Sequence, residues 1–421
     1  MTDAPTRADA ERLDAGDPLA AYRDRFVVTD PDLLYLDGNS LGRLPAQTTD
    51  TLTRVVRAEW GDALIRSWRH WINLPTEVGD LIGTRLLGAR PGEVVVSDAT
   101  TVNLYKLAVA ALDAHPDRRV VVTDDDNFPT DRYVLQGLCE QRGLELRLVH
   151  TDLDEGVDAD AVRAGVGADT ALVSLSHVAY RSGALAPLPQ ITAIAHEAGA
   201  LTLWDLSHAA GAVPVELAAH HVDLAVGCTY KYLCGGPGAP AFLYVRRDLQ
   251  DRLRQPIWGW FGQRGQFEMG EGYDPQPDIR RFLVGTPPVL QLAAVRAGST
   301  LLAEAGIERL RAKGIALTDL AVRLADAWLG PLGFRVASPR DSARRGSHVT
   351  LHHPDARRMT RALIEQAAVV PDFRTPDRIR LGPAPIATRF VDVYDAMARL
   401  RDLVAAGAHE RYDDDERAVV T

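Results

Sequence analysis

The chain has 421 residues, of which 46% are hydrophobic and 25% are charged. This length and composition are typical of a soluble globular protein with room for two domains and a large core. The formal net charge of −10 argues against a nucleic-acid partner, because binding phosphates requires a basic surface.

The cysteines and the N-terminus indicate the cellular compartment of the protein and whether it binds a metal. The three cysteines are an odd number without a paired spacing, which predicts neither a disulfide framework nor a zinc site and favours a reducing environment. The N-terminus has no apolar signal core, and no uninterrupted apolar run approaches the roughly 18 residues of a membrane span. We therefore expect a cytoplasmic protein that binds no metal and no membrane.

Predicted helices and strands alternate in the first part of the chain. A short helix is expected over residues 17–26, a strand over 33–36 and a helix over 48–68, although Glu59 interrupts the apolar stripe of that helix. Helical stretches also separate several strands, and this alternation favours a mostly parallel sheet with helices on both faces. The strands are expected at residues 94–96, 120–123, 144–149, 171–175, 201–203, 224–226 and 242–245, and helices between them include 100–114 and 189–198.

The last third of the chain predicts a smaller domain. Two loops rich in glycine and proline, residues 256–263 and 281–288, carry aromatic side chains and are expected to be binding segments. A long helical region over residues 290–328 follows them. The acidic run over residues 413–416 indicates a solvated end. Further strands are expected at residues 334–337, 348–351 and 379–381, and helices at 355–367 and 390–405.

A carboxylate and an amine follow two of the apolar runs. Asp205 follows the run at 201–203, and Lys231 stands after another run, between Tyr230 and Tyr232. A lysine in a desolvated pocket can form an imine with an aldehyde, and a nearby aspartate keeps a pyridine nitrogen protonated so that the ring accepts electrons. The pair predicts pyridoxal phosphate as cofactor. Alternatively, Lys231 is a loop or helix cation and Asp205 caps a strand end.

Three further features fit either a ligand contact or a structural role. Thr100 and Thr101 begin a helix, where hydroxyls and free N–H groups can bind a phosphate, although Thr100 could instead cap the helix. Phe128 follows a strand and either stacks on a flat ring or anchors in the core. The loop over residues 37–45 is either ordinary turn chemistry or backbone shaped to approach a ligand.

Six motifs, in order and spread over nearly the whole chain, resemble those of the kynureninase family. The resemblance implies an α/β fold of the pyridoxal-phosphate fold type I, with a large domain around a mostly parallel seven-stranded sheet and a smaller α+β C-terminal domain. It places an N-terminal segment that packs with the small domain at residues 1–45, the large domain at 46–300 and the small domain at 301–421. The motifs are Tyr35-Leu-Asp-Gly-Asn-Ser-Leu-Gly42, Asn127-Phe-Pro-Thr-Asp131, Asp205-Leu-Ser-His208, Tyr230-Lys-Tyr-Leu233, Gly259-Trp-Phe-Gly262 and Ile379-Arg-Leu-Gly-Pro383.

The resemblance also implies roles for single residues. Lys231 would hold the cofactor as an imine and shuttle protons, and Tyr230 would supply an acid; Arg380 would clamp the substrate carboxylate through a bidentate pair. Trp260 and Thr286 would come from the partner subunit of a homodimer with its active sites at the interface. Contacts with the cofactor are implied for Thr100, Thr101, Phe128, Asp131, Ser176, Asp205, His208, Tyr230, Lys231, Trp260 and Thr286, and contacts with the substrate for Ser40, Asp62 and Arg380.

The implied reaction is the hydrolysis of L-kynurenine to anthranilate and L-alanine, with cleavage between the β and γ carbons through an aldimine, a quinonoid and a ketimine. Asp62 and Thr286 stand where animal members have other residues, and Gln263 replaces a histidine common at its position. Because Thr286 resembles the bacterial type, we expect unsubstituted kynurenine to be preferred over 3-hydroxykynurenine. A role in tryptophan catabolism and one in NAD biosynthesis both stay open.

Three alternatives compete with this interpretation. A class V aminotransferase or a cysteine desulfurase shares the lysine, aspartate and phosphate site, but Cys234 follows Lys231 too closely to serve easily as a mobile nucleophile. A cofactor-binding protein without catalysis is disfavoured by the intact set of catalytic residues. A metal hydrolase is disfavoured because the histidine pairs at 220–221 and 352–353 lack the one-turn spacing of a zinc-binding helix.

Overall fold

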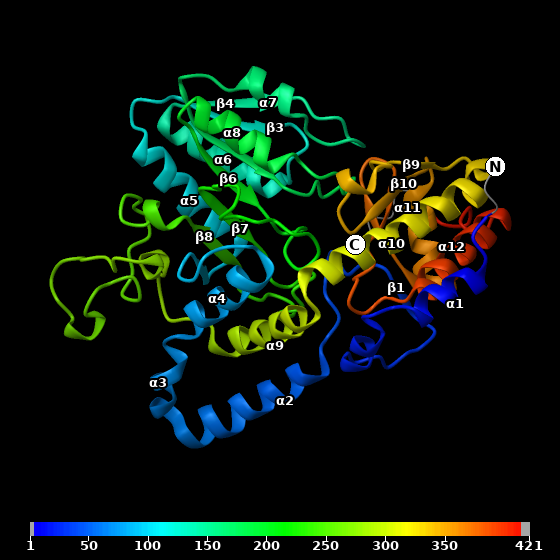
Figure 1. Ribbon diagram of the computed structural model, residues 1–421, viewed down its shortest axis with the longest axis horizontal. Helices are drawn as coiled ribbons and strands as arrows, with labels where there is room; N and C mark the ends of the chain where they lie inside the picture. The colour runs from blue at the N-terminus through cyan, green and yellow to red at the C-terminus, as the bar shows by residue number, and fades with distance from the viewer. Residues whose placement is uncertain (1–3, 414–421) are drawn as a thin grey trace.

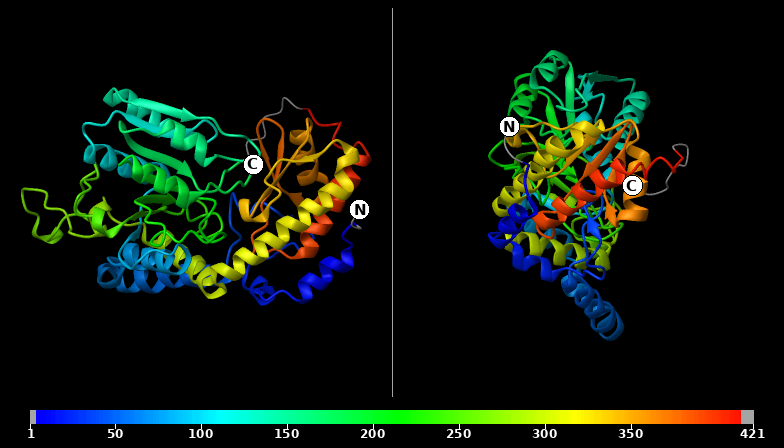
Figure 2. Two further views of the ribbon diagram at one scale, coloured as in Figure 1. Left: turned by 45° about the horizontal axis from the view of Figure 1, so that its top comes forward. Right: turned by 90° about the vertical axis from the view of Figure 1, so that its right-hand side faces the viewer.

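The computed structural model describes residues 4–413, which form a larger and a smaller part with separate apolar cores (Figure 1). The larger part surrounds a seven-stranded sheet, on the left in Figure 1, and the smaller part holds the N-terminal helix and the last third of the chain. Figure 2 shows the same arrangement from two further sides. Of the acidic run expected at 413–416, only Asp413 lies within the described residues.

The large sheet has the strand order β2-β8-β7-β6-β5-β3-β4. Neighbouring strands pair in parallel except at β8, which is antiparallel to both β2 and β7. The strands lie where the apolar runs predict them, because runs of valine and leucine are suited to strands buried on both faces, and the mostly parallel sheet is confirmed. The bounds are β2 (Val94–Val96), β3 (Val120–Asp124), β4 (Glu145–Val149), β5 (Thr170–Ser176), β6 (Leu201–Asp205), β7 (Leu224–Gly227) and β8 (Phe242–Val245).

Helices cover both faces of this sheet, as predicted. Successive side chains of a strand point to opposite faces, so Val94 and Val96 enter one apolar cluster and Val95 enters the other. The helices of the larger part therefore divide between the two faces of the sheet, and each buries its apolar side in one of these two clusters. The first cluster includes residues of α4 (Leu74–Leu86), α7 (Ala159–Gly165), α8 (Leu188–Glu197) and α9 (Val289–Ala305), and the second includes residues of α5 (Thr100–Ala114) and α6 (Pro129–Arg142).

The helix predicted over residues 48–68 is present as far as Ala63, but it changes from α to π geometry and then breaks. The segment contains α2 (Ala46–Arg54), a π-helix over Val55–Ala63, a 3-10 helix over Leu64–Ser67 and α3 (Trp68–Trp71). The break falls at Leu64, whose φ is +54°. The Glu59 carboxylate accepts a hydrogen bond from Trp71 Nε1 at 2.6 Å, and the Ser67 hydroxyl donates to the Glu59 carbonyl at 2.8 Å. These bonds attach the residues after the break to Glu59, the polar residue that interrupts the apolar stripe.

The smaller part is an antiparallel sheet of strand order β12-β13-β10-β9 covered by helices. The N-terminal segment joins it, because α1 packs on α12, and Ala10, Leu34 and Leu36 enter its apolar core. This smaller α+β part agrees with the predicted fold class. The bounds are α1 (Arg7–Ala15), β1 (Leu34–Tyr35), β9 (Arg335–Val336), β10 (Val349–His352), β11 (Val369–Val370), β12 (Asp372–Arg374), β13 (Arg378–Leu381), α10 (Ile307–Leu324), α11 (Ala356–Ala367) and α12 (Phe390–Ala405).

Two other predicted helices differ from the structure. The region 290–328 contains α9 and α10 with Gly306 between them, whose φ of +83° is a conformation that ends a helix. The helix predicted over 17–26 is a 3-10 helix over Ala20–Arg25. Its start is fixed by Asp17, which accepts a hydrogen bond from the Leu19 amide at 2.8 Å and also pairs with a lysine of α10.

Candidate active site

Lys231 lies in the loop after β7 and is half-buried. Its Nζ is 2.9 Å from His208 Nε2, and it lies 5.9 Å from the ring centre of Phe128 and 6.0 Å from that of Tyr230. Among the described residues, no carboxylate forms an ion pair with this amine. An amine surrounded by an imidazole and two aromatic rings, without a counter-ion, is suited to covalent chemistry with an aldehyde.

Two buried carboxylates lie close to this amine. Asp205 ends β6, and Asp131 lies in the first turn of α6. Burial, followed by the charge of Asp205, raises the pKa of Asp131 well above its ordinary value, whereas the charge of Lys231 lowers it. Asp205 Oδ1 accepts a hydrogen bond from the Ser207 amide at 2.7 Å, but Asp131 Oδ2 has no partner among residues 4–413. The unpaired oxygen of Asp131 can therefore accept a hydrogen bond from a protonated group of a ligand.

Two buried histidines complete the surroundings of the amine. Burial, followed by the charge of Lys231, lowers the pKa of His208 well below its ordinary value, so the ring is neutral. The ring of His348 lies 5.3 Å from that of His208, and neither of its nitrogens has a partner within the described part of the chain. Sequence reasoning missed His348, because its only signal is a polar residue before a strand.

Phe128 and Ser176 lie at the ends of β3 and β5. Asn127 connects them: its Oδ1 accepts hydrogen bonds from Ser176 Oγ at 2.7 Å and from the Phe128 amide at 2.8 Å. The Phe128 ring is 38% exposed and meets the ring of Tyr180 edge-on at 5.4 Å. Because the ring is not packed in the core, the anchor alternative is wrong, and one ring face can stack on a flat ligand.

The start of α5 is open to an anion. Thr100 is the first helical residue and Ala99 occupies the cap position without a side-chain hydrogen bond, so the alternative that Thr100 caps the helix is wrong. The hydroxyls of Thr100 and Thr101 and the first N–H groups of the helix are suited to a phosphate. Lys106, which sequence reasoning missed, is fully buried and donates to Asp98 Oδ2 at 2.6 Å, which fixes the loop that enters the helix.

A buried arginine lies in the smaller part. Arg380 on β13 is 1% exposed; it forms an ion pair with Asp372 directly opposite on β12, and its Nη2 donates to Ser40 Oγ at 2.8 Å. Its Nη1 donates to the Tyr180 carbonyl of the larger part at 2.6 Å. Asp372 also pairs with Arg374 at 2.7 Å. Two guanidinium groups therefore share one carboxylate, which leaves a net positive charge for an anionic ligand.

The loop after β1 joins this arginine site to the lysine loop. The Gly42 amide donates to the Tyr230 carbonyl at 2.8 Å, and a Cβ at Gly42 would lie 2.2 Å from the Lys231 carbonyl oxygen. The loop is thus shaped for close approach rather than being an ordinary turn. Asp37 in the same loop is buried, and burial together with the charge of Asp372 raises its pKa to about 7.

Three of the predicted site residues lie elsewhere on the surface of the chain. Asp62 is exposed in the π-helix after α2, and Thr286 is exposed in the loop before α9. Trp260 is 40% exposed, and its ring lies 4.7 Å from that of Phe261. The structure therefore gathers Lys231 with its neighbours within one chain but leaves these three outside that group.

Residues 4–413 contain no group of three or more histidine, cysteine, aspartate or glutamate side chains that could hold a metal ion. Over the same range, no helix combines the length and the apolar character that crossing a membrane requires.

Two solved structures share this fold, and one of them holds pyridoxal phosphate. The apo cysteine desulfurase of Thermococcus onnurineus NA1 matches with a TM-score of 0.78 and 18% identity over 96% of this chain and 99% of the other. A C-DES variant with glycine covalently linked to its cofactor matches with a TM-score of 0.78 and 20% identity over 94% and 99%. These likenesses show the fold. An amine beside two buried carboxylates, one of them with an unsatisfied oxygen, fits that cofactor. Fold and site thus define a fold type I, pyridoxal-phosphate-dependent enzyme.

Proteins of similar sequence identify the family within this class of enzymes. A family model described as the kynureninase C-terminal domain matches residues 310–400. The chain is 42% identical over 409 residues to the kynureninase of Pseudomonas fluorescens, covering 95% of each, and 41% identical over 426 residues to that of Burkholderia pseudomallei (strain K96243), covering 99% of this chain and 100% of the other. The chain belongs to the kynureninase family and is a pyridoxal-phosphate-dependent hydrolase.

Proposed function

We propose that this protein hydrolyses L-kynurenine to anthranilate and L-alanine. The proposal rests mainly on one cluster: the Lys231 amine 2.9 Å from His208 Nε2, with the buried carboxylates of Asp131 and Asp205 close by. The relatives named kynureninase, which match almost the full length of the chain, support the same reaction. We also assign the domain boundaries at residues 45 and 300, which the shared core of the N-terminal segment and the smaller part supports.

In this proposal the larger part holds the cofactor. Pyridoxal phosphate, when bound, supplies a sink for the electrons released at the substrate α carbon. Asp205 would hold the protonated ring nitrogen, and Asp131, whose Oδ2 has no partner among residues 4–413, would be a second polar partner of the cofactor. Phe128 would stack on the ring. Thr100, Thr101 and Tyr230 would hold the phosphate at the start of α5, and Ser176 and His208 would complete the contacts.

The smaller part binds the substrate carboxylate. Arg380 offers a planar fork suited to a carboxylate, and Ser40 adds a hydroxyl that already lies 2.8 Å from Arg380 Nη2. Asp372, on the opposite strand, holds the guanidinium in place. The substrate carboxylate then supplies the second negative charge that Arg380 and Arg374 lack when they share Asp372.

Two residues would move protons. Lys231 accepts the proton of the substrate α carbon, and neutral His208 receives a hydrogen bond from its ammonium form at the observed 2.9 Å. Burial, followed by the Cys228 thiol, raises the pKa of Tyr230 above its ordinary value, so its hydroxyl keeps its proton until the reaction requires an acid. We assign to Tyr230 the protonation of the substrate β carbon after the bond to the γ carbon is broken.

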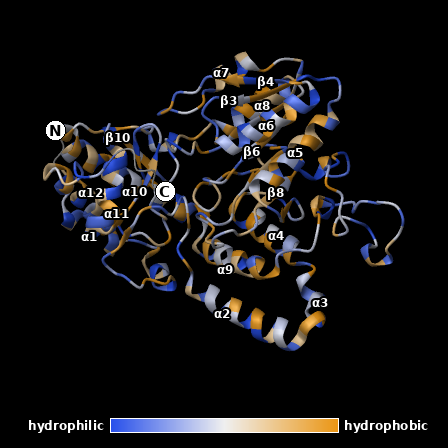
Figure 3. Cartoon of the chain, turned by 180° about the vertical axis from the view of Figure 1, so that it is seen from behind, coloured by the Kyte–Doolittle hydropathy of each residue, from blue (hydrophilic) through white to orange (hydrophobic). Residues whose placement is uncertain are grey.

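We further propose a homodimer in which Trp260, Thr286 and Asp62 reach the site of the partner. Large apolar side chains are exposed in the π-helix after α2 and in the yellow-green segment that projects from the body of the chain in the left view of Figure 2. Exposed apolar side chains of this size mark an association surface, and Figure 3 shows hydrophobic stretches in the segment between α2 and α3. The most open side chains, 58–76% exposed, include Trp60, Ile65, Trp258, Phe267 and Met269.

The finer substrate choice is also a proposal. Because the partner subunit would contribute Asp62 and Thr286 to the site, we infer that unsubstituted kynurenine is preferred over 3-hydroxykynurenine. The ratio of the two kcat/KM values tests this, and a clear preference for the hydroxylated substrate would refute it.

The reaction itself is tested with the purified holoprotein and L-kynurenine, following the fluorescence of anthranilate. Turnover is expected in the unaltered protein and not in Lys231→Ala, whose circular dichroism and melting temperature serve as the folding control. No anthranilate from the cofactor-loaded protein would refute the proposal. Desulfurase chemistry is the weaker candidate, because all three cysteines are buried and burial raises the pKa of Cys234 to about 12.

A further inference from the structure

A second cleft lies between the two parts of the chain, near the ends of β4 and β5. Its volume is about 980 Å3, and its wall includes residues of both parts, from His177 and Gln190 to Arg311 on α10. None of the residues that line it among those described is one that we assign to the cofactor or to kynurenine. The cleft is therefore distinct from the site around Lys231, although His177 directly follows Ser176 in the chain.

His177 is another residue of this wall, but it brings no charge to it. The side chain is 8% exposed, its ring meets that of Trp204 edge-on, and its Nδ1 is enclosed by the protein. Burial, followed in the same direction by the charges of Arg311 and His220, lowers its pKa to about 4, although a hydrogen bond with the Ala186 backbone opposes the shift. The ring is therefore neutral near pH 7 and does not compete with Arg311 for an anion.

Arg311 brings an uncompensated positive charge to the same wall. Its side chain is partly buried and donates only to backbone carbonyls, those of Ser342 at 2.7 Å and Gly346 at 3.4 Å; within residues 4–413 it forms no ion pair. Burial, followed by the charge of the nearby Arg345, lowers its pKa, and the charge of Asp319 opposes this shift without forming an ion pair. A partly buried guanidinium of this kind gains from an anionic ligand.

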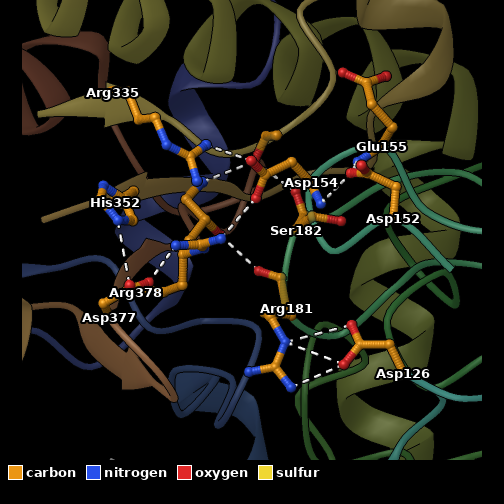
Figure 4. Close-up of polar contacts among 12 residues, drawn as sticks. Asp126, Asp152, Asp154, Glu155, Arg181, Ser182, Arg335, His352, Asp377 and Arg378 are labelled. Carbon is orange, nitrogen blue, oxygen red and sulfur yellow. Dashed lines mark hydrogen bonds and ion pairs between the residues drawn. The ribbon is translucent and has the colours of Figure 1, made fainter.

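Three acidic residues among those described line the cleft: Asp152, Glu155 and Asp158. Glu155 pairs with Arg344 at 3.1 Å, and the Asp152 carboxylate accepts hydrogen bonds from two backbone amides at 2.8 and 2.9 Å. Asp158 is exposed to solvent. The neighbouring Asp154 pairs with Arg378 at 2.8 Å, as Figure 4 shows. These contacts hold the loop after β4, and none of these carboxylates forms an ion pair with Arg311.

We propose that this cleft binds a small carboxylate with a flat apolar body. The carboxylate contacts Arg311. The apolar part of the wall includes Val157, Leu188, Val213 and Val215. One guanidinium is enough for a single negative charge but too little for a phosphate, and the apolar residues favour a ring or short chain over a hydrated ion.

The location of the ligand is tested with 4-bromobenzoate in crystals of the holoenzyme, because bromine gives an anomalous signal. The expected result is a bromine peak in the cleft with the carboxylate on Arg311. A peak only at the site around Lys231, no peak, or a peak without measurable binding in solution would each overturn the proposal. This experiment needs no variant and does not depend on turnover, so its failure is separate from that of the proposed reaction.

Affinity is tested by titration calorimetry with benzoate. Arg311→Gln is expected to weaken binding by about tenfold or more, the usual effect of losing a hydrogen bond to a charged group. Arg309→Gln is the matched control, since Arg309 lies on the same helix, is exposed and does not line the cleft; it should leave the affinity unchanged. Should Arg311→Gln not fold, Arg311→Lys keeps the charge, and loss of only its fork is expected to weaken binding less than tenfold.

Two other probes test the class of ligand. Benzamide has the same ring without the charge and should bind at least tenfold more weakly than benzoate. Inorganic sulfate has charge without an apolar body and should not compete at equal concentration. Equal affinity of benzamide, full competition by sulfate, or equal effects of the Arg309 and Arg311 variants would refute the proposed class.

Discussion

The buried carboxyl of Asp37 is expected to reduce stability at high pH. Its pKa is raised from 3.8 to about 7, so the folded protein keeps a proton that the unfolded chain releases. The free energy of unfolding therefore falls as the pH rises from about 4 to 7 and changes no further above that. At about 1.4 kcal/mol for each tenfold change in proton affinity, the full loss is roughly 4 kcal/mol at pH 8. Asp37→Asn removes the carboxyl with little change of shape.

Urea unfolding of the holoprotein at several pH values measures this effect. We expect the variant to exceed the unaltered protein in free energy of unfolding by an amount that grows from near zero at pH 4 to at most about 4 kcal/mol at pH 8. Asp24→Asn, which removes the same charge from an exposed position, is the control. If Asp37→Asn and the unaltered protein change in parallel between pH 5 and 8, the folded protein holds no proton at Asp37 and the reasoning is refuted.

Three further substitutions test the geometry of the site. Arg380→Lys should raise the KM for kynurenine at least about tenfold, with a smaller effect on kcat, because lysine cannot form the bidentate pair; steady-state kinetics decide. Gly42→Ala should destabilise the protein by about 1–3 kcal/mol, since the added Cβ lies 2.2 Å from the Lys231 carbonyl oxygen; urea unfolding would contradict this if the midpoint stayed the same. Lys106→Met should weaken pyridoxal phosphate several-fold by releasing Asp98 before α5, as absorbance titration would show; unchanged affinity would mean that this ion pair does not shape the phosphate site.

The strands of the large sheet could be predicted from sequence because each one is recognised from its own residues alone. Runs such as Val94–Val96 and Phe242–Val245 are apolar over their whole length and have one reasonable use, as strands covered on both faces. The helix predicted after residue 48 breaks at Leu64 for a reason outside that pattern. The hydrogen bond from Trp71 to Glu59 joins residues twelve apart, so the apolar stripe gives no warning of the break.

The candidate site was predictable in part. Lys231 and Asp205 follow apolar strands, and parallel strands deliver such residues to one edge of the sheet, so their proximity follows from the alternation of elements. The buried ions Asp372 and Lys106 could not be found this way. The sequence does not say which charge pairs with Arg380 or with Asp98, and burial of a charge can be recognised only when the matching charge is seen beside it.

The segment before residue 45 connects the two ends of the site. β1 pairs with β11 in the smaller part, while Gly42, a few residues later, is hydrogen-bonded to the Tyr230 carbonyl in the lysine loop. Ser40 lies between these two attachments and contacts Arg380. Because both ends of so short a segment are fixed, the smaller part cannot shift far from the lysine loop without breaking one of them. The distance between the carboxylate-binding arginine and the amine is therefore set by the N-terminal segment as well as by the contact between the two domains.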